Sequence, residues 1–127
     1  TMRRLMDERE QLRIVDDQIG APTWCRTIAQ VTSLVLARLP ADRDAQMAVR
    51  GVYHLAPSGS TSWFGFASAI RDRLGLRCEL QPIPTSAYPT AAARPPNSRM
   101  DASRLEQTFG LAMPGWEDEL RRCLAPS

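Results

Sequence analysis

The stretch LRIVDDQIGAPT, residues 12–23, decides the fold class of this chain. Leu12–Val15 has strand character, because it contains the β-branched residues Ile14 and Val15. Asp16–Pro22 is a polar loop that contains a glycine and a proline, and Thr23 is a suitable N-cap for a helix that follows. A strand, a polar loop and a helix in direct succession are typical of α/β proteins.

Helices and short strands alternate along the rest of the chain. Met2, Leu5 and Met6 have the i, i+3, i+4 spacing of a helix. The apolar residues from Trp24 to about Arg38 form one wide helical face, and the segment that ends at Leu74 has the same period. We therefore expect an α/β fold. Its further elements are strands at Gly51–Leu55 and Cys78–Ile83, a polar connection at Pro40–Arg50, and helices ending at Phe109 and spanning Trp116–Leu124.

Capping residues predict where several of these helices begin and end. Thr61 or Ser62 is expected to cap the helix that ends at a left-handed Gly75. Asp101 is a good N-cap for the next helix, which Gly110 closes. The tryptophans and phenylalanines lie in predicted helices, so we expect most of them to be in the core.

Composition excludes several classes of function. The net charge is only +2, and basic residues are mixed with acidic ones, which argues against a nucleic-acid-binding surface. All 16 basic residues are arginine, so Schiff-base and P-loop chemistry lack their lysine. The 127 residues make one domain or a large part of one.

Cysteine usage and hydropathy favour a cytoplasmic protein. Cys25, Cys78 and Cys123 are far apart and without C-x-x-C spacing, so we expect reduced thiols and no zinc site. No apolar run approaches the ~20 residues of a membrane span. The charged first residues also lack the apolar region of a signal peptide.

The strongest candidate for a binding site is Arg94-Pro95-Pro96-Asn97-Ser98. The two prolines restrict the backbone and hold Arg94, Asn97 and Ser98 in limited directions. Arginine binds phosphate with a bidentate fork, while asparagine and serine suit sugar hydroxyls or base edges. The alternative is that Arg94 pairs with a carboxylate and tethers this loop to the core.

A second candidate follows the first strand. Asp17 and Gln18 precede a Gly-x-Pro turn in which Gly20 allows close approach of the backbone. Ligands of open α/β sheets bind at this edge, although residue types alone favour an Asx-type turn that only connects a strand to a helix. His54 is the single histidine and has no triad partners nearby in sequence. Tyr53 and Tyr88 lack a lysine four residues on.

Several segments in this order resemble the dTDP-4-dehydrorhamnose reductase family of extended short-chain dehydrogenases. The two long ones are Asp17–Thr23 and Arg94–Leu105. The shorter ones are Gly51–Leu55, Pro82-Ile83 with Tyr88-Pro89, and Phe109-Gly110-Leu111 with Pro114 and Trp116. The similarity covers practically the whole chain, and the two long blocks occur together at the expected separation.

The resemblance implies that residues 1–127 are the C-terminal, substrate-binding portion of an NAD(P)-binding Rossmann-like reductase. Family members use NADPH or NADH to reduce the C4 ketone of a dTDP-4-dehydro-L-sugar. Their dinucleotide-binding domain and catalytic residues precede the matched region, so we expect no catalytic, cofactor-binding or metal-binding residue here. The expected substrate-binding residues are Gln18, Arg94, Asn97 and Ser98.

The resemblance also leaves a second class of function open, because the same fold serves as a non-catalytic regulatory subunit, as in the methionine adenosyltransferase β subunit. In either case we expect the partners to be a dTDP-sugar and an N-terminal Rossmann domain. The isolated chain is expected to be inactive. It should self-associate into a homo-oligomer, because its sheet edge and the Trp24–Leu39 helix would be left uncovered.

Overall fold

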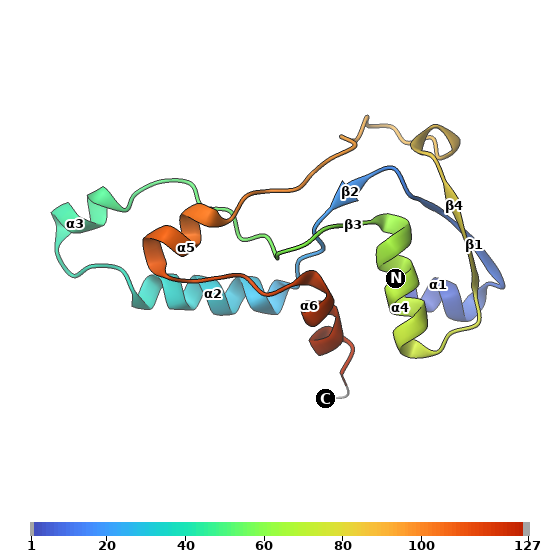
Figure 1. Cartoon of the computed structure of the whole chain (residues 1–127), viewed down its shortest axis with the longest axis horizontal. Coiled ribbons are helices and arrows are strands. Elements are labelled where there is room, and N and C mark those ends of the chain that lie inside the picture. The colour runs from blue at the N-terminus through green and yellow to red at the C-terminus, as the bar shows by residue number, and fades with distance from the viewer. Residues whose placement is uncertain (1, 126–127) are drawn as a thin grey trace.

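The computed structural model of the chain describes residues 2–125 and has the mixed α/β architecture expected from the sequence (Figure 1). The helices and strands follow one another as α1 (Met2–Glu8), β1 (Gln11–Val15), β2 (Ile19–Gly20), α2 (Cys25–Ala37), α3 (Arg43–Ala48), β3 (Thr61–Ser62), α4 (Trp63–Leu74), β4 (Glu79–Ile83), the short 3₁₀ helix η1 (Thr85–Ala87), α5 (Ser103–Phe109) and α6 (Trp116–Cys123). In Figure 1, β1, β4, α1 and α4 gather at one end of an elongated molecule, and α2, α3 and α5 extend to the other.

β1 and β4 form a parallel two-stranded sheet in which Gln11 lies opposite Glu79 and Val15 opposite Ile83. A parallel pair needs a crossover connection, and here the chain from β2 to α4 makes it. Leu12 and Ile14 are buried, while Arg13 between them is exposed. One face of the strand therefore packs against the core.

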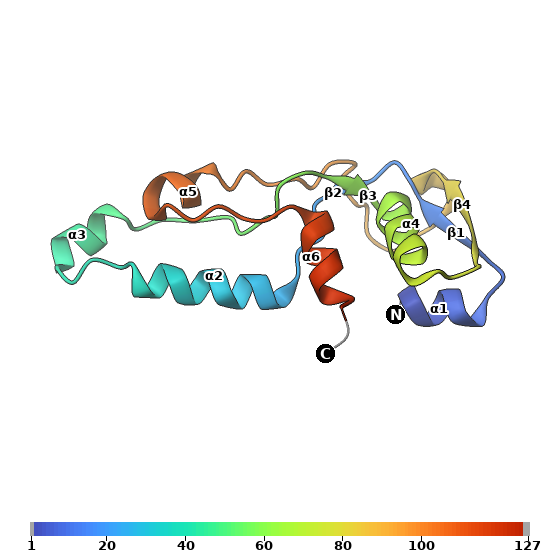
Figure 2. The same ribbon diagram turned by 60° about the horizontal axis from the view of Figure 1, so that its bottom comes forward.

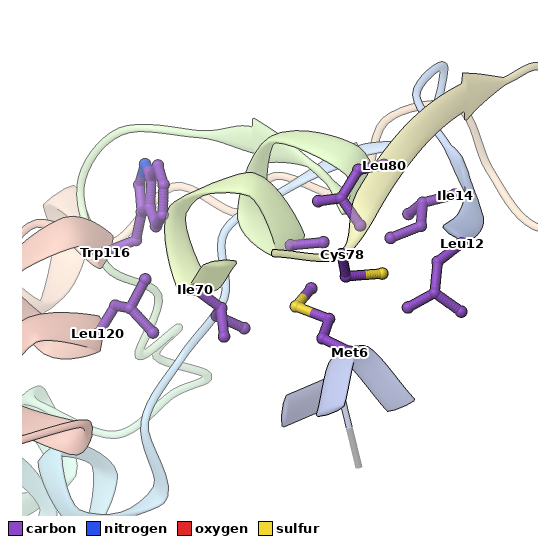
Figure 3. Close-up of a cluster of buried hydrophobic side chains, with 9 residues drawn as sticks. Met6, Leu12, Ile14, Ile70, Cys78, Leu80, Trp116 and Leu120 are labelled. Atoms are coloured by element: carbon purple, nitrogen blue, oxygen red, sulfur yellow. The ribbon is translucent and has the colours of Figure 1, made fainter. Parts of the chain in front are cut away.

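The larger core lies between this sheet and α1, α4 and α6 (Figure 3). α4 contributes Ala67 and Ile70 to it, and the edge of the Trp116 ring approaches Phe66 at a centroid distance of 6.1 Å. This cluster fixes the sheet against α4, whose N-terminus starts close to the carboxyl end of β1. Its other buried members are Met6, Leu12, Ile14, Cys78, Leu80 and Leu120.

A second cluster joins α2 to α5, which run side by side in both views (Figures 1 and 2). Val31 of α2 packs with Leu105 and Phe109 of α5. The Arg38 guanidinium at the end of α2 donates to the carbonyl oxygens of Phe109 and Gly110, which terminate α5. This contact satisfies carbonyl groups that a helix C-terminus leaves without intrahelical partners.

Several predicted boundaries are confirmed. The hydroxyl of Ser62 caps α4 by accepting from the Gly65 N–H at 2.9 Å. Gly75 and Gly110 end their helices with φ angles of 64° and 62°, in the left-handed region that glycine adopts without a steric penalty. The helix at Met2–Glu8 and the strands near Leu12 and Cys78 are also found where the sequence predicts them.

The predicted strand at Gly51–Leu55 is wrong. Tyr53 and Leu55 pack on the second cluster, and the Tyr53 ring contacts that of Phe109 at 5.2 Å. No strand within residues 2–125 pairs with this segment. Tyr53 and Leu55 are thus held by partial burial, Val52 is exposed, and the segment forms no hydrogen-bonded ladder with the described residues.

Two helix starts and one connection also differ from the predictions. The Thr23 hydroxyl donates to the Ala21 carbonyl oxygen and does not cap α2. Asp101 accepts from the Ser103 N–H but lies one residue before the N-cap of α5. The connection at Pro40–Arg50 contains α3, which Asp42 caps through the Ala45 N–H.

The predicted apolar face of α2 is only partly buried. Val31 is 7% exposed, whereas Ile28 is 40% and Leu34 is 46% exposed. Half of this face therefore has no cover within the described residues. No helix among them is long and apolar enough to cross a membrane.

Candidate substrate-binding site

The candidate site is built at the carboxyl ends of β1 and β4. Because the two strands are parallel, the loops that follow them leave from the same edge of the sheet. Asp17, just after β1, accepts from the Thr85 N–H at 2.9 Å and also from the Thr85 hydroxyl. The Gln18 side-chain amide donates to the same hydroxyl at 3.0 Å. Thr85 thus joins the two strand ends.

These hydrogen bonds favour the ionised form of the Asp17 side chain. The hydroxyl and N–H of Thr85 both donate to the carboxylate and lower the pKa of Asp17 below its ordinary value. The Ser62 hydroxyl similarly donates to the neighbouring Asp16 carboxylate. The first two residues of the loop are therefore anchored, Asp17 to η1 just after β4 and Asp16 to the residue that caps α4.

Ile19 brings together the two long sequence blocks on which the family resemblance rests. It pairs with Ser62 of β3 on one side. On the other side its N–H donates to the Pro96 carbonyl and its carbonyl accepts from the Ser98 N–H, each at 2.8 Å. A Cβ on Gly20 would lie 2.8 Å from the Ser98 Oγ, so any side chain at this position would force the Ser98 hydroxyl to move.

A cavity of about 210 Å³ opens where these segments meet. Gln18, Arg94 and Ser98 all line it, together with Thr61 and Trp63. A second cavity of about 720 Å³ runs along β1, and Gln18, Trp63 and Arg94 line this one too. Three of the four predicted binding residues are thus brought to one place, and their contact with a substrate stays a prediction.

The fourth predicted residue, Asn97, is differently engaged. Its Oδ1 accepts from the N–H and the Nε of Arg99, both at 3.1 Å, and the residue lines neither cavity. Within residues 2–125, no hydrogen bond or ion pair engages the Arg94 guanidinium. The carboxylate tether considered for Arg94 has no partner in that part of the chain.

Trp63 is the residue of this site that sequence reasoning missed. Its place in the apolar period of α4 predicts a core side chain, yet it is 50% exposed. Trp116 and Phe109, by contrast, are buried as expected. The sequence did contain a signal for this exposure: Trp63 directly follows the capping Ser62 and therefore lies at the end of α4 that is nearest the sheet edge.

His54 and Asp101 contact each other and line neither cavity. His54 is exposed, and its Nδ1 lies 3.2 Å from the Asp101 carbonyl oxygen. The Ser103 N–H and hydroxyl lower the pKa of Asp101, with a smaller contribution from His54. Across residues 2–125, no three His, Cys, Asp or Glu side chains are grouped to hold a metal ion. The three cysteines are free.

Solved structures define the class of protein to which this architecture corresponds. The dTDP-4-dehydrorhamnose reductase of Bacillus anthracis, determined in complex with NADP, superposes with a TM-score of 0.82 at 33% identity. The superposed region covers 95% of this chain and 40% of the Bacillus anthracis chain. The Clostridium acetobutylicum reductase gives the same TM-score at 29% identity and the same coverage.

Sequence comparison gives the family. Residues 1–127 match the family model of the RmlD substrate binding domain, and the chain belongs to this family. The dTDP-4-dehydrorhamnose reductase of Burkholderia thailandensis is 44% identical over 132 residues, which cover 98% of this chain. The Escherichia coli K12 reductase is 37% identical over 131 residues. The chain spans 44% of the length of the first relative and 42% of the second.

Proposed function

We propose that residues 1–127 are the substrate-binding portion of an NAD(P)H-dependent dTDP-4-dehydrorhamnose reductase. The parent enzyme would reduce the C4 ketone of dTDP-4-dehydro-L-rhamnose and so form dTDP-L-rhamnose. The observation that carries this proposal is the meeting of residues 17–20 and 94–98 around one cavity at the carboxyl edge of the sheet. The reductases to which the chain is similar support the substrate class.

Within this proposal, each side chain at the cavity has a task that suits its chemistry. The Arg94 guanidinium, which has no partner within residues 2–125, binds the diphosphate, because its fork matches two phosphate oxygens. Ser98 and Gln18 donate to or accept from sugar hydroxyls. The β2–β3 pair and the backbone bonds of Ile19 hold these groups in place before the substrate arrives.

The nicotinamide dinucleotide is assigned to an N-terminal Rossmann domain of the parent. The glycines of residues 2–125 lie singly and make no Gly-rich turn that could cradle a diphosphate. The residues present here therefore do not fit the dinucleotide, and no hydride-transfer step involves them. Binding and orientation of the sugar nucleotide are the tasks left to this portion.

The free edge of β1 supports the attachment of such a domain. The Asp16 N–H donates to Ile83, and the Glu79 N–H donates to Glu10, so alternate residues of β1 point their polar backbone groups toward β4. The residues between them, Gln11, Arg13 and Val15, point their backbone N–H and C=O groups to the opposite edge of β1. On β4 the outward position holds Pro82, which has no N–H to offer a further strand. The sheet can therefore extend only beyond β1.

The second cavity, about 720 Å³, follows this same free edge. Gln11, Arg13 and Val15 of β1 line it, as do Met2 and Leu5 of α1. A strand of the preceding domain would occupy the part of this groove beside Gln11, Arg13 and Val15 and bury the apolar side chains there, and the part lined by Gln18, Trp63 and Arg94 would remain open to a ligand.

The Arg94 contact provides the test of the proposed function. In the full-length protein, Arg94→Ala should raise the KM for the sugar nucleotide roughly tenfold to a hundredfold, because a charge-assisted phosphate contact is lost. The KM for NADPH and the melting temperature should not change. Arg43→Ala on the exposed surface of α3 is the matched control. Unchanged sugar-nucleotide affinity with a lower melting temperature would make Arg94 a structural residue.

The regulatory-subunit alternative has no support in the comparisons, since the similar proteins described above are reductases. The two hypotheses differ in activity: a full-length protein that carries this chain and fails to oxidise NADPH with the 4-keto sugar nucleotide would favour the regulator. The isolated chain should be inactive in either case.

The proposal extends to partners and location. A cytoplasmic enzyme acting on a dTDP-sugar needs no nucleic-acid or membrane surface, and the balance of 16 basic and 14 acidic residues offers neither. Reduced Cys25, Cys78 and Cys123 suit the cytoplasm.

A further inference from the structure

Trp63 is the tryptophan that lines the candidate site, and its side chain is not part of the hydrophobic core. It is the first residue of α4 and is 50% exposed. The next turns of the same helix place Phe66, Ala67 and Ile70 on the large core cluster, which does not include Trp63. The half-exposed indole offers a flat apolar face on which a ligand can pack.

The backbone that carries Trp63 is nonetheless firmly held. Ser62, directly before it, pairs with Ile19 across the β2–β3 ribbon. The Ser62 hydroxyl accepts from the Gly65 N–H and donates to the Asp16 carboxylate. The indole therefore projects from a fixed point, and little conformational entropy is lost when a ligand packs on it.

Trp63 also stands where the two cavities meet. Only three residues line both of them, namely Gln18, Trp63 and Arg94. A cavity of about 210 Å³ is small for a nucleotide sugar, whereas both together exceed what such a ligand needs. An elongated ligand that enters both cavities must pass these three side chains.

A flat aromatic ring and a guanidinium that line the same cavities, the guanidinium having no partner within residues 2–125, are the combination that recognises a nucleotide. The ring stacks on the base, and the guanidinium binds the phosphates. We propose that Trp63 is the stacking platform for the nucleobase of the sugar nucleotide, with the diphosphate on Arg94. This inference rests on the proposed function and adds a residue and a task to it.

The test uses the full-length protein that contains this chain and two probes, dTDP and inorganic pyrophosphate. Calorimetric titration gives the affinity for dTDP, and competition gives that for pyrophosphate. Trp63→Ala should weaken dTDP binding about tenfold to a hundredfold, as loss of base stacking does, and leave pyrophosphate binding unchanged. Trp63→Phe should restore most of the dTDP affinity, since it keeps an aromatic face.

Two further variants separate this role from others. Arg94→Ala should weaken both probes, because both carry the diphosphate. Leu36→Ala removes another exposed apolar side chain, 63% exposed on α2 and outside both cavities, and should change neither affinity.

Several outcomes would overturn the proposal. Equal weakening of dTDP and pyrophosphate by Trp63→Ala would mean that the indole only supports the fold of the site. An effect on the dTDP-sugar with none on dTDP would place the sugar, and not the base, on the ring. If the wild-type protein binds neither dTDP nor the dTDP-sugar, the proposed function itself fails, which is a distinct result.

Discussion

Replacement of Glu119 should reveal how α6 holds the start of α2. The side chain is 2% exposed, and its Oε2 accepts from the Trp24 N–H at 2.8 Å. The other oxygen, Oε1, has no hydrogen-bond partner among the described residues. One hydrogen bond, accepted by a buried carboxylate, therefore connects two helices that belong to different core clusters.

The size of the effect follows from this single contact. A hydrogen bond to a charged group contributes about 1.5–3 kcal/mol, and Glu119→Ala also leaves the Trp24 N–H without its acceptor. The free energy of unfolding should fall by about that amount, and the melting temperature by roughly 6–12 °C for a chain of this size. Glu119→Gln keeps a carbonyl acceptor and should remain within about 1 kcal/mol of the wild type.

Urea unfolding followed by circular dichroism measures these differences. Glu117→Ala is the matched control, since it removes an exposed glutamate from the same first turn of α6. It should cost no more than about 1 kcal/mol through the helix dipole. A Glu119→Ala variant as stable as the wild type would refute the reasoning, because the cost of burying the charge would then cancel the bond. A Gln variant as unstable as the Ala variant would show that the charge is required.

The remaining predictions concern pH, a helix end and assembly. The Thr85 hydrogen bonds lower the pKa of Asp17, so this carboxylate stabilises the folded state above the ordinary aspartate pKa and loses that effect as the pH falls. The Asp17→Asn variant should therefore lose less stability than the wild type when urea titrations are compared between about pH 5 and pH 3. Gly75→Ala should lower the free energy of unfolding by about 1–2 kcal/mol and Gly75→Asn by less, because only the backbone conformation opposes a Cβ there; equal melting temperatures of the two variants would contradict this. The isolated chain should self-associate through the free edge of β1 and the exposed face of α2, and a stable monomer at high concentration in sedimentation would count against it.

Local signals in the sequence predicted the parts of the fold that depend on near neighbours. The cap at Ser62 and the left-handed Gly75 and Gly110 each involve residues within a few positions of one another. Predictions that depend on distant residues were less successful. Thr23 looks like a cap, yet the N–H of the next residue bonds to Glu119, 95 positions away. No local pattern contains that information.

The strand predicted at Gly51–Leu55 and the core position predicted for Trp63 were wrong for a related reason. Propensity and periodicity describe what a segment can do, whereas partners decide whether a strand forms or a face is covered. For the candidate site, the residue types of the stiff block at Arg94–Ser98 suggested binding, whereas the loop at Gln18 was selected through the family resemblance. Their meeting on the two sides of Ile19 required the three-dimensional structure.

The parallel pairing of β1 with β4 has a consequence for synthesis of the protein on the ribosome. Asp17 and its partner Thr85, at the ends of the two strands, are 68 residues apart in the chain. At roughly 5–20 residues per second, β4 is translated about 3–14 s after β1. During that interval the edge of β1 that faces β4 lacks its native hydrogen bonds, and Leu12 and Ile14 have no β4 to pack beside. The nascent chain therefore carries an apolar strand with an unpaired edge for seconds, which is the kind of segment that chaperones bind.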